Sequence, residues 1–137
     1  MKILEVRTEK RKIGDIGENI AQKHLKKDGY KILKLNYVAV GNEIDIIAES
    51  KDTIAFIEVK TRTVGHTNPK EIRPAAAVTP EKQRKIISTA KYYLGIIRNT
   101  KRVSLDVIEV YLNSDGTENK VLHIKNAFNL NTAYRRR

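Results

Sequence analysis

The sequence predicts an α/β domain built around a mixed β-sheet. Two stretches carry apolar residues at three- and four-residue spacing, which predicts helices, and five short stretches rich in Ile, Val, Leu, Tyr and Phe predict strands, in the order α-β-β-β-α-β-β. The chain has 137 residues, 40% hydrophobic and 31% charged, a composition that suits one domain with one buried core. We therefore expect residues 1–137 to form a single domain.

The first helix is expected over residues 12–28. Its apolar face is formed by Ile13, Ile16, Ile20, Ala21 and Leu25. Gly29 follows as a candidate C-cap. Within this segment, Asp15 and Glu18 have the spacing of a capping box, in which the glutamate would bond a backbone amide at a helix start.

Three strands are expected next, over residues 30–37, 43–48 and 53–60, separated by turn-forming sequences. They predict an antiparallel meander. The third strand is apolar on both faces until its end, which is typical of a central strand covered on both sides. Residues 61–78 show no periodicity, so we expect a functional or mobile loop there.

A second helix is expected over residues 80–98, with Thr79 as N-cap and Pro80 at its first position. Strands over 103–112 and 120–125 follow. Because a strand, a long helical crossover and another strand form a βαβ-like unit, strand 103–112 should lie parallel to a strand of the meander.

The charge balance points to nucleic acid as the partner. The chain has 27 Lys and Arg against 16 Asp and Glu, a formal net charge of +11, and a field of one sign attracts polyanions. The basic end of the chain, within residues 129–137, is expected to be frayed. No segment approaches the roughly 18 apolar residues of a membrane span, and no signal peptide is visible, so we expect a cytoplasmic protein with no membrane partner.

Several chemistries are excluded by composition. Without cysteine, the chain has no disulfide framework, thiolate zinc site or cysteine nucleophile. It also lacks the phosphate-binding loop of nucleotide hydrolases and the GxSxG motif of serine hydrolases.

Two carboxylates and a lysine are expected to converge on neighbouring strands. Glu58 and Lys60 share a strand face, and a hairpin with its turn near residues 49–53 places Asp45 across from residues 57–59. Such oxygen ligands suit Mg²⁺ or Mn²⁺, which can activate water and withdraw charge from a phosphoryl group. The cluster therefore predicts phosphodiester chemistry. The alternative is structural: a salt bridge at a strand end, with the aspartate bonded to a turn.

The residue spacing sharpens this hypothesis. Asp45, twelve residues and then Glu58-Val59-Lys60 have the form of the PD-(D/E)XK nuclease signature, carried on two neighbouring strands. The chain also resembles the YraN-like family of small bacterial proteins, which is similar to the archaeal Holliday-junction resolvases of that nuclease superfamily. The segments that carry the resemblance are Gly17-Glu18, Gly29-Tyr30, Asn36-Tyr37, Glu43 to Ala48, Phe56 to Arg62, Val78 to Lys82, Tyr93-Leu94 and Asp106 to Ile108. Two local departures are Asn42, where the family often has glycine, and Ser104-Leu105, where it more often shows Arg-Phe.

The resemblance implies a restriction-endonuclease-like core. In it, Asp45, Glu58 and the Val59 carbonyl would hold the metal, Lys60 would assist the attacking water, and Glu18 would add a further carboxylate.

Three basic residues are candidates for contact with a nucleic-acid backbone. Arg62 lies beyond the signature lysine, on its face if the strand continues, and could bind a phosphate bidentately. Lys82 and Lys85 lie on the second helix. Each of the three could instead be an ordinary solvated side chain.

We therefore expect a metal-dependent endonuclease that binds DNA rather than RNA, branched or otherwise non-duplex in form, and hydrolyses phosphodiester bonds. The alternative is a nucleic-acid-binding or adaptor protein that retains the nuclease fold without chemistry. Because one site faces one strand, cutting both strands of a symmetric junction would require a homodimer.

Overall fold

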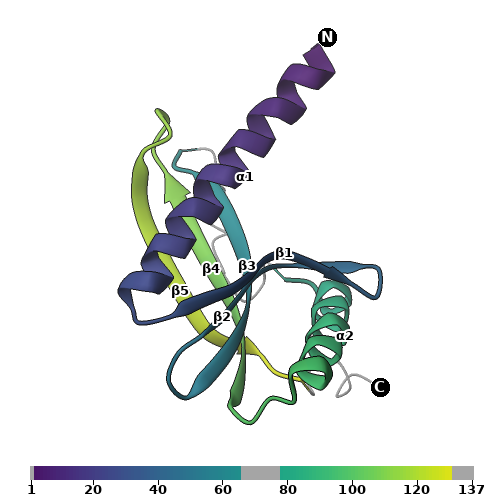
Figure 1. Cartoon of the computed structure of the whole chain (residues 1–137). Coiled ribbons are helices and arrows are strands. Elements are labelled where there is room, and N and C mark those ends of the chain that lie inside the picture. The colour runs from purple at the N-terminus through teal and green to yellow at the C-terminus, as the bar shows by residue number, and fades with distance from the viewer. Residues whose placement is uncertain (1, 66–77, 131–137) are drawn as a thin grey trace.

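The computed structural model of the chain describes residues 2–65 and 78–130, and of residues 2–8 only the backbone. Its elements are α1 (Lys2–Lys27), β1 (Lys31–Ala39), β2 (Asn42–Glu49), β3 (Thr53–Thr63), α2 (Pro80–Ile97), β4 (Arg102–Leu112) and β5 (Glu118–Phe128). The strands form one sheet in sequence order (Figure 1). Within the described ranges, neither helix combines the length and hydropathy that crossing a bilayer requires.

The predicted fold class is confirmed. β1, β2 and β3 form an antiparallel meander, α2 crosses over, and β4 returns parallel to β3. β5 then pairs with β4 antiparallel at the opposite edge from β1. The result is an α/β fold with a five-stranded mixed sheet, and β3 is the central strand, as its two apolar faces predicted.

The prediction that the first helix begins at residue 12 is wrong, because α1 already begins at Lys2. Apolar periodicity could not indicate the first turns, since this half of α1 projects past the sheet and has no core to face (Figure 1). Its Lys, Glu and Arg residues are nevertheless good helix formers. The capping-box interpretation of Asp15 and Glu18 is also wrong, because both lie in the middle of α1.

The expected loop over residues 61–78 begins later than predicted. β3 continues through Thr63, which pairs with Leu112 at the end of β4. Residues 66–77 of the expected loop, and residues 131–137 of the expected frayed end, lie outside the described part of the chain.

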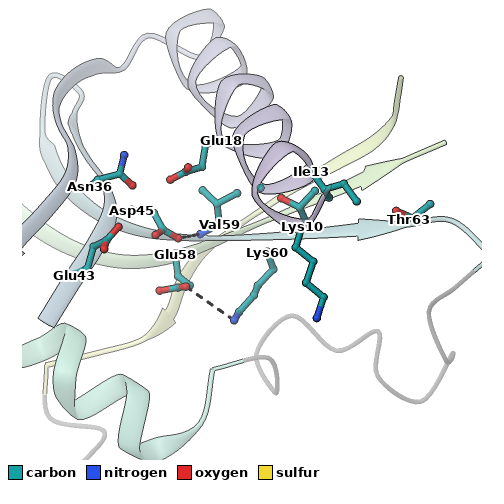
Figure 2. Close-up of a pocket in the computed structure, with 12 residues that line it drawn as sticks. Lys10, Ile13, Glu18, Asn36, Glu43, Asp45, Glu58, Val59, Lys60 and Thr63 are labelled. Carbon is teal, nitrogen blue, oxygen red and sulfur yellow. Dashed lines mark hydrogen bonds and ion pairs between the residues drawn. The ribbon is translucent and has the colours of Figure 1, made fainter. Parts of the chain in front are cut away.

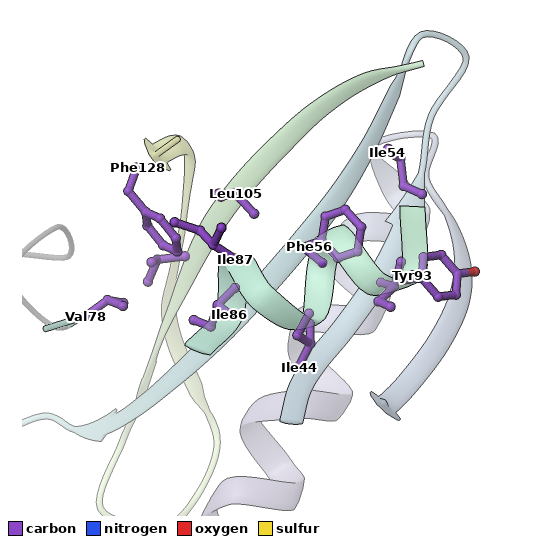
Figure 3. Close-up of a cluster of buried hydrophobic side chains, with 12 residues drawn as sticks. Ile44, Ile54, Phe56, Val78, Ile86, Ile87, Tyr93, Leu105 and Phe128 are labelled. Carbon is purple, nitrogen blue, oxygen red and sulfur yellow. The ribbon is translucent and has the colours of Figure 1, made fainter. Parts of the chain in front are cut away.

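The sheet is covered on both faces, by α1 on one side and α2 on the other (Figure 1). Along β3, Ala55 and Ile57 belong to the cluster that includes buried residues of α1. Ile54 and Phe56 belong to the α2 cluster, where Phe56 packs edge-on against Tyr93 with ring centroids 6.0 Å apart (Figure 3). Burial on both faces fixes the register of β3, because a slip of one residue would exchange the two sets.

α1 packs onto β3 through a glycine. A Cβ atom on Gly17 would lie 1.8 Å from Oγ1 of Thr61, so a larger residue fits only if the helix or Thr61 shifts. This close approach of helix backbone and strand fixes the position of the next residue, Glu18.

We predict that Gly17→Ala lowers the free energy of unfolding by about 1–3 kcal/mol, because the added methyl group overpacks the contact with Thr61. Urea denaturation measures the change. Gly14→Ala is the matched control, since a Cβ on Gly14 meets nothing within 4 Å and alanine favours a helix over glycine. Equal stability changes in the two variants would contradict the assignment of Gly17 as a docking contact.

Candidate functional site

β2 and β3 bring Asp45 beside Glu58. The register pairs Ile46 with Ile57, so the preceding residue of β2 lies across from the following residue of β3. The Oδ2 atom of Asp45 accepts a hydrogen bond of 2.8 Å from the backbone N–H of Val59. This is the placement that the hairpin predicted, and the bond fixes the Asp45 carboxylate against β3.

The two carboxylates line a cavity of about 560 Å³ between α1 and the end of β3 (Figure 2). The ionisable residues lining it are Lys10, Glu18, Glu43, Asp45, Glu58 and Lys60. Four carboxyl groups therefore face two ammonium groups. The predicted residues Glu18, Asp45, Glu58, Val59 and Lys60 all line this cavity.

Glu58 is nearly buried, with 9% of its surface exposed. Burial and the neighbouring charge of Asp45, to which it also hydrogen-bonds, raise the pKa of Glu58 to about 7, although Lys82 and Lys60 act in the opposite direction. The Nζ atom of Lys60 lies 4.0 Å from Oε1 of Glu58. The ammonium groups of Lys82 and Lys60 therefore do not offset the cost of ionising Glu58, which is buried next to the Asp45 carboxyl group.

Glu18 is held in the same acidic group. Burial raises the pKa of Glu18 to about 7, and the charges of Asp45, Asp15 and Glu43 contribute in the same direction. With its amide nitrogen oriented toward the carboxylates, Asn36 donates to Oε1 of Glu18 (3.1 Å) and to Oε1 of Glu43 (3.0 Å). Asn36 thus links α1 to β2 across the cavity.

Sequence reasoning missed Asn36, Glu43 and Lys10 as residues of the site. A signal for Glu43 was present, because it precedes Asp45 by two residues on one strand and so shares its face. Asn36 has a positive φ of 48°, which distorts β1 locally and cannot be read from strand periodicity.

The oxygen donors fit a small divalent cation in number and type. No three His, Cys, Asp or Glu side chains among the described residues form a ready-made metal cluster. Mg²⁺ nevertheless needs only one or two carboxylates in proteins, since water and phosphate oxygens complete its shell. Asp45 and Glu58 supply two carboxylates, and burial together with the charge of Asp45 raises the pKa of Glu58.

Arg62 has a partner that the sequence did not predict. β3 does continue through this residue, but its Nε donates to Oε2 of Glu109 at 3.1 Å. The Glu109 side chain is fully buried, and its Oε1 has no hydrogen-bond partner within the described residues. Arg62 is therefore the cation that makes a buried carboxylate tolerable, rather than a solvated side chain.

The two predicted lysines of α2 differ in their surroundings. Lys82 is close enough to Glu58 to lower the pKa of that carboxyl group, so the first turn of α2 adds positive charge to the site. Lys85 is exposed and lies 3.7 Å from Glu81 on the same helix. Neither lysine is among the residues that line the cavity, although Lys82 acts on Glu58, and a nucleic-acid contact by either lysine stays a prediction.

Asp106 belongs to a separate polar cluster on β4 and β5. It accepts hydrogen bonds from the hydroxyl of Ser104 and from the backbone N–H of Asn126, and it contacts Nε2 of His123 at 2.7 Å. These partners satisfy a carboxylate that is 1% exposed. Ser104, one of the local departures noted in the sequence, therefore supports Asp106 structurally.

Comparison with known protein families matches most of the residues that line the cavity, but not Lys10, Ile13 and Gly14. The model of a family described as "Uncharacterised protein family UPF0102" matches residues 17–110, which include Glu18, Asp45, Glu58 and Lys60. A UPF0102 protein of Caldanaerobacter subterraneus subsp. tengcongensis is 44% identical over 87% of this chain and 96% of its own length. A UPF0102 protein of Clostridioides difficile is 44% identical over 84% of this chain and 95% of its own length.

Among solved structures, an XisH family protein from Nostoc punctiforme PCC 73102 has 15% sequence identity and a TM-score of 0.33. The alignment covers 78% of this chain and 98% of that one. A likeness at this level supports no conclusion about this chain.

We predict that the cation-free protein loses stability as the pH rises from about 4.5 to about 7, and that Glu58→Gln removes part of this loss. The folded state raises the pKa of Glu58, so below pH 4.5 the group is neutral in both states and costs nothing. At higher pH the unfolded chain ionises first, which favours unfolding. Urea denaturation between pH 4 and 8.5 measures the effect.

Glu118→Gln is the matched control for this pH series, because Glu118 is an exposed residue at the start of β5. Its pH profile should follow that of the wild type. A Glu58→Gln profile parallel to both would contradict the raised pKa.

We predict that Arg62→Met lowers the free energy of unfolding by about 3–5 kcal/mol, because it leaves the buried Glu109 carboxylate without a cation. Adding Glu109→Gln should restore much of the loss, as thermal and urea denaturation would show. The exposed pair Lys85 and Glu81 is the control, since Lys85→Met should change stability by less than about 1 kcal/mol. A double variant no more stable than Arg62→Met would contradict this coupling.

Proposed function

Since the chain belongs to the uncharacterised protein family UPF0102, whose name assigns no activity, we propose its function from the cavity between α1 and β3. The membership agrees with the resemblance to the YraN-like family. We propose that the protein is a metal-dependent endonuclease that hydrolyses phosphodiester bonds in DNA of branched or otherwise non-duplex form. The observation that carries the proposal is the contact of Asp45 with Glu58, with the Lys60 ammonium 4.0 Å from Glu58.

The carboxylates of Asp45 and Glu58 and the backbone carbonyl of Val59 would hold Mg²⁺ or Mn²⁺. When bound, such an ion lowers the pKa of a coordinated water and stabilises negative charge on the phosphoryl group. The hydrogen bond from the Val59 amide to Oδ2 holds the Asp45 carboxylate against β3, where it would act as a ligand of the ion. The Glu58 side chain and the Val59 carbonyl, which are adjacent on β3, would thus bind the same ion.

The charge of the cavity supports a requirement for the cation before substrate can bind. Four carboxyl groups against two ammonium groups would repel a phosphate when ionised. A divalent ion would offset this excess, so the cavity would become attractive to an anionic strand. The net charge of +11 would then favour approach of the nucleic acid over the rest of the surface.

Lys60 and Glu18 would act on the reacting groups. The Lys60 ammonium is half-buried, with 34% of its side chain exposed, and can donate a hydrogen bond to the attacking water or to a phosphate oxygen. Glu18 lies on the other wall, where α1 holds it beside Asp45, and its carboxylate can orient water. Both side chains already line the cavity, so neither has to move into it to take these roles.

We predict that the wild type cleaves DNA in the presence of Mg²⁺ or Mn²⁺ and that Asp45→Asn and Lys60→Ala each lower the rate by about 100-fold or more. Asp45→Asn removes a carboxylate from the proposed metal site, and Lys60→Ala removes the nearest cation. Linear duplex, single-stranded and four-way-junction DNA are compared on denaturing gels.

Asp28→Asn is the control, because it makes the same chemical change at an exposed residue after α1, outside the cavity. It should cleave like the wild type. Absence of cleavage on every substrate, or cleavage unaffected by both site variants, would contradict the proposal. Tight, strongly salt-dependent binding without cleavage would favour the alternative of a non-catalytic binding protein.

A further inference from the structure

We propose that Lys10 of α1 binds the phosphate adjacent to the one that is cleaved, so that the projecting half of α1 forms a wall for a single nucleic-acid strand. This inference rests on the proposed function and adds a substrate contact to it. Lys10 lies seven residues before Gly17, on the part of α1 that extends past the sheet (Figure 1).

Lys10 occupies the face of α1 that elsewhere covers the sheet. Moving back along α1 from Leu25 in steps of three or four residues gives Ala21, Gly17, Gly14 and Lys10, so these residues form one stripe. Leu25, Ala21 and Gly17 are buried. The stripe becomes charged at Lys10, where α1 borders the cavity instead of the core. Its side chain therefore points over the site and not to the opposite side of the helix.

Within the described part of the chain, Lys10 has no ion pair. By contrast, Lys12 lies 3.9 Å from Glu9, and Lys60 lies 4.0 Å from Glu58. An exposed ammonium without a carboxylate partner can bind a phosphate without first breaking an ion pair.

The cavity has an acidic end and a basic end. Figure 2 shows Asn36 and Glu43 on one side of Asp45 and Glu58, and Lys60 and Lys10 on the side toward Thr63. A strand whose reacting phosphate lies at Asp45 and Glu58 would continue along β3 toward the basic end. The neighbouring phosphate of that strand would then contact the Lys10 ammonium. The arrangement of charges in the cavity favours this path for the nucleic-acid strand.

Fluorescence anisotropy of labelled single-stranded and junction DNA, titrated with Mg²⁺ over a range of salt concentrations, tests this contact. Lys10→Ala should weaken binding on the order of tenfold at 0.1 M salt and reduce the salt slope by about one unit, since one phosphate contact is lost. Lys10→Arg should retain both properties. Lys12→Ala is the matched control because it removes the same charge from the opposite face of α1, and it should bind like the wild type.

A second measurement locates the contact. Replacing single phosphates by uncharged methylphosphonates should identify one position beside the cleavage site whose neutralisation weakens binding by the wild type but not by Lys10→Ala. Circular dichroism verifies that each variant is helical. Equal binding by Lys10→Ala and the wild type, while the wild type cleaves DNA, would overturn this inference alone. A wild type that neither binds nor cleaves DNA in Mg²⁺ would overturn the proposed function and this inference with it.

Discussion

The contact between Asp45 and Glu58 is the constraint on which the proposed site depends. The antiparallel register of β2 and β3 sets the two carboxyl groups side by side, and the Val59 amide holds one of them in place. Burial and the neighbouring charge of Asp45 then make ionisation of Glu58 unfavourable, as its raised pKa indicates. Two carboxylates in such a position carry an electrostatic cost, which protonation of Glu58 relieves and which the proposed cation would also relieve.

The other elements place further groups around this pair. α1 approaches β3 closely enough, through Gly17, to bring Glu18 to the same cavity. The crossover through α2 brings the positive charge of Lys82 near Glu58 from the other face of the sheet. The first half of β3 is mostly apolar on both faces, and its charged residues, Glu58, Lys60 and Arg62, all lie in the second half. The first half of β3 thus contributes to the core, and its second half lines the cavity.

Much of this arrangement follows from local sequence patterns, and the remainder does not. The two-residue period of strands and the short turn between β2 and β3 are sufficient to predict that Asp45 faces Glu58. The start of α1 could not be predicted from periodicity because its first turns face no core. The pair of Arg62 with Glu109 joins residues 47 positions apart, through a parallel register that only the tertiary fold determines.

In the function that we propose, Asp45 and Glu58 share one divalent cation. Nuclear magnetic resonance of the isotope-labelled protein during titration with Mn²⁺ tests it most directly, because the paramagnetic ion broadens signals from nearby nuclei. We expect the backbone amides of residues 45, 58 and 59 to broaden first, and Asp45→Asn to abolish this selectivity. Broadening that begins elsewhere, or that is unchanged in Asp45→Asn, would contradict it.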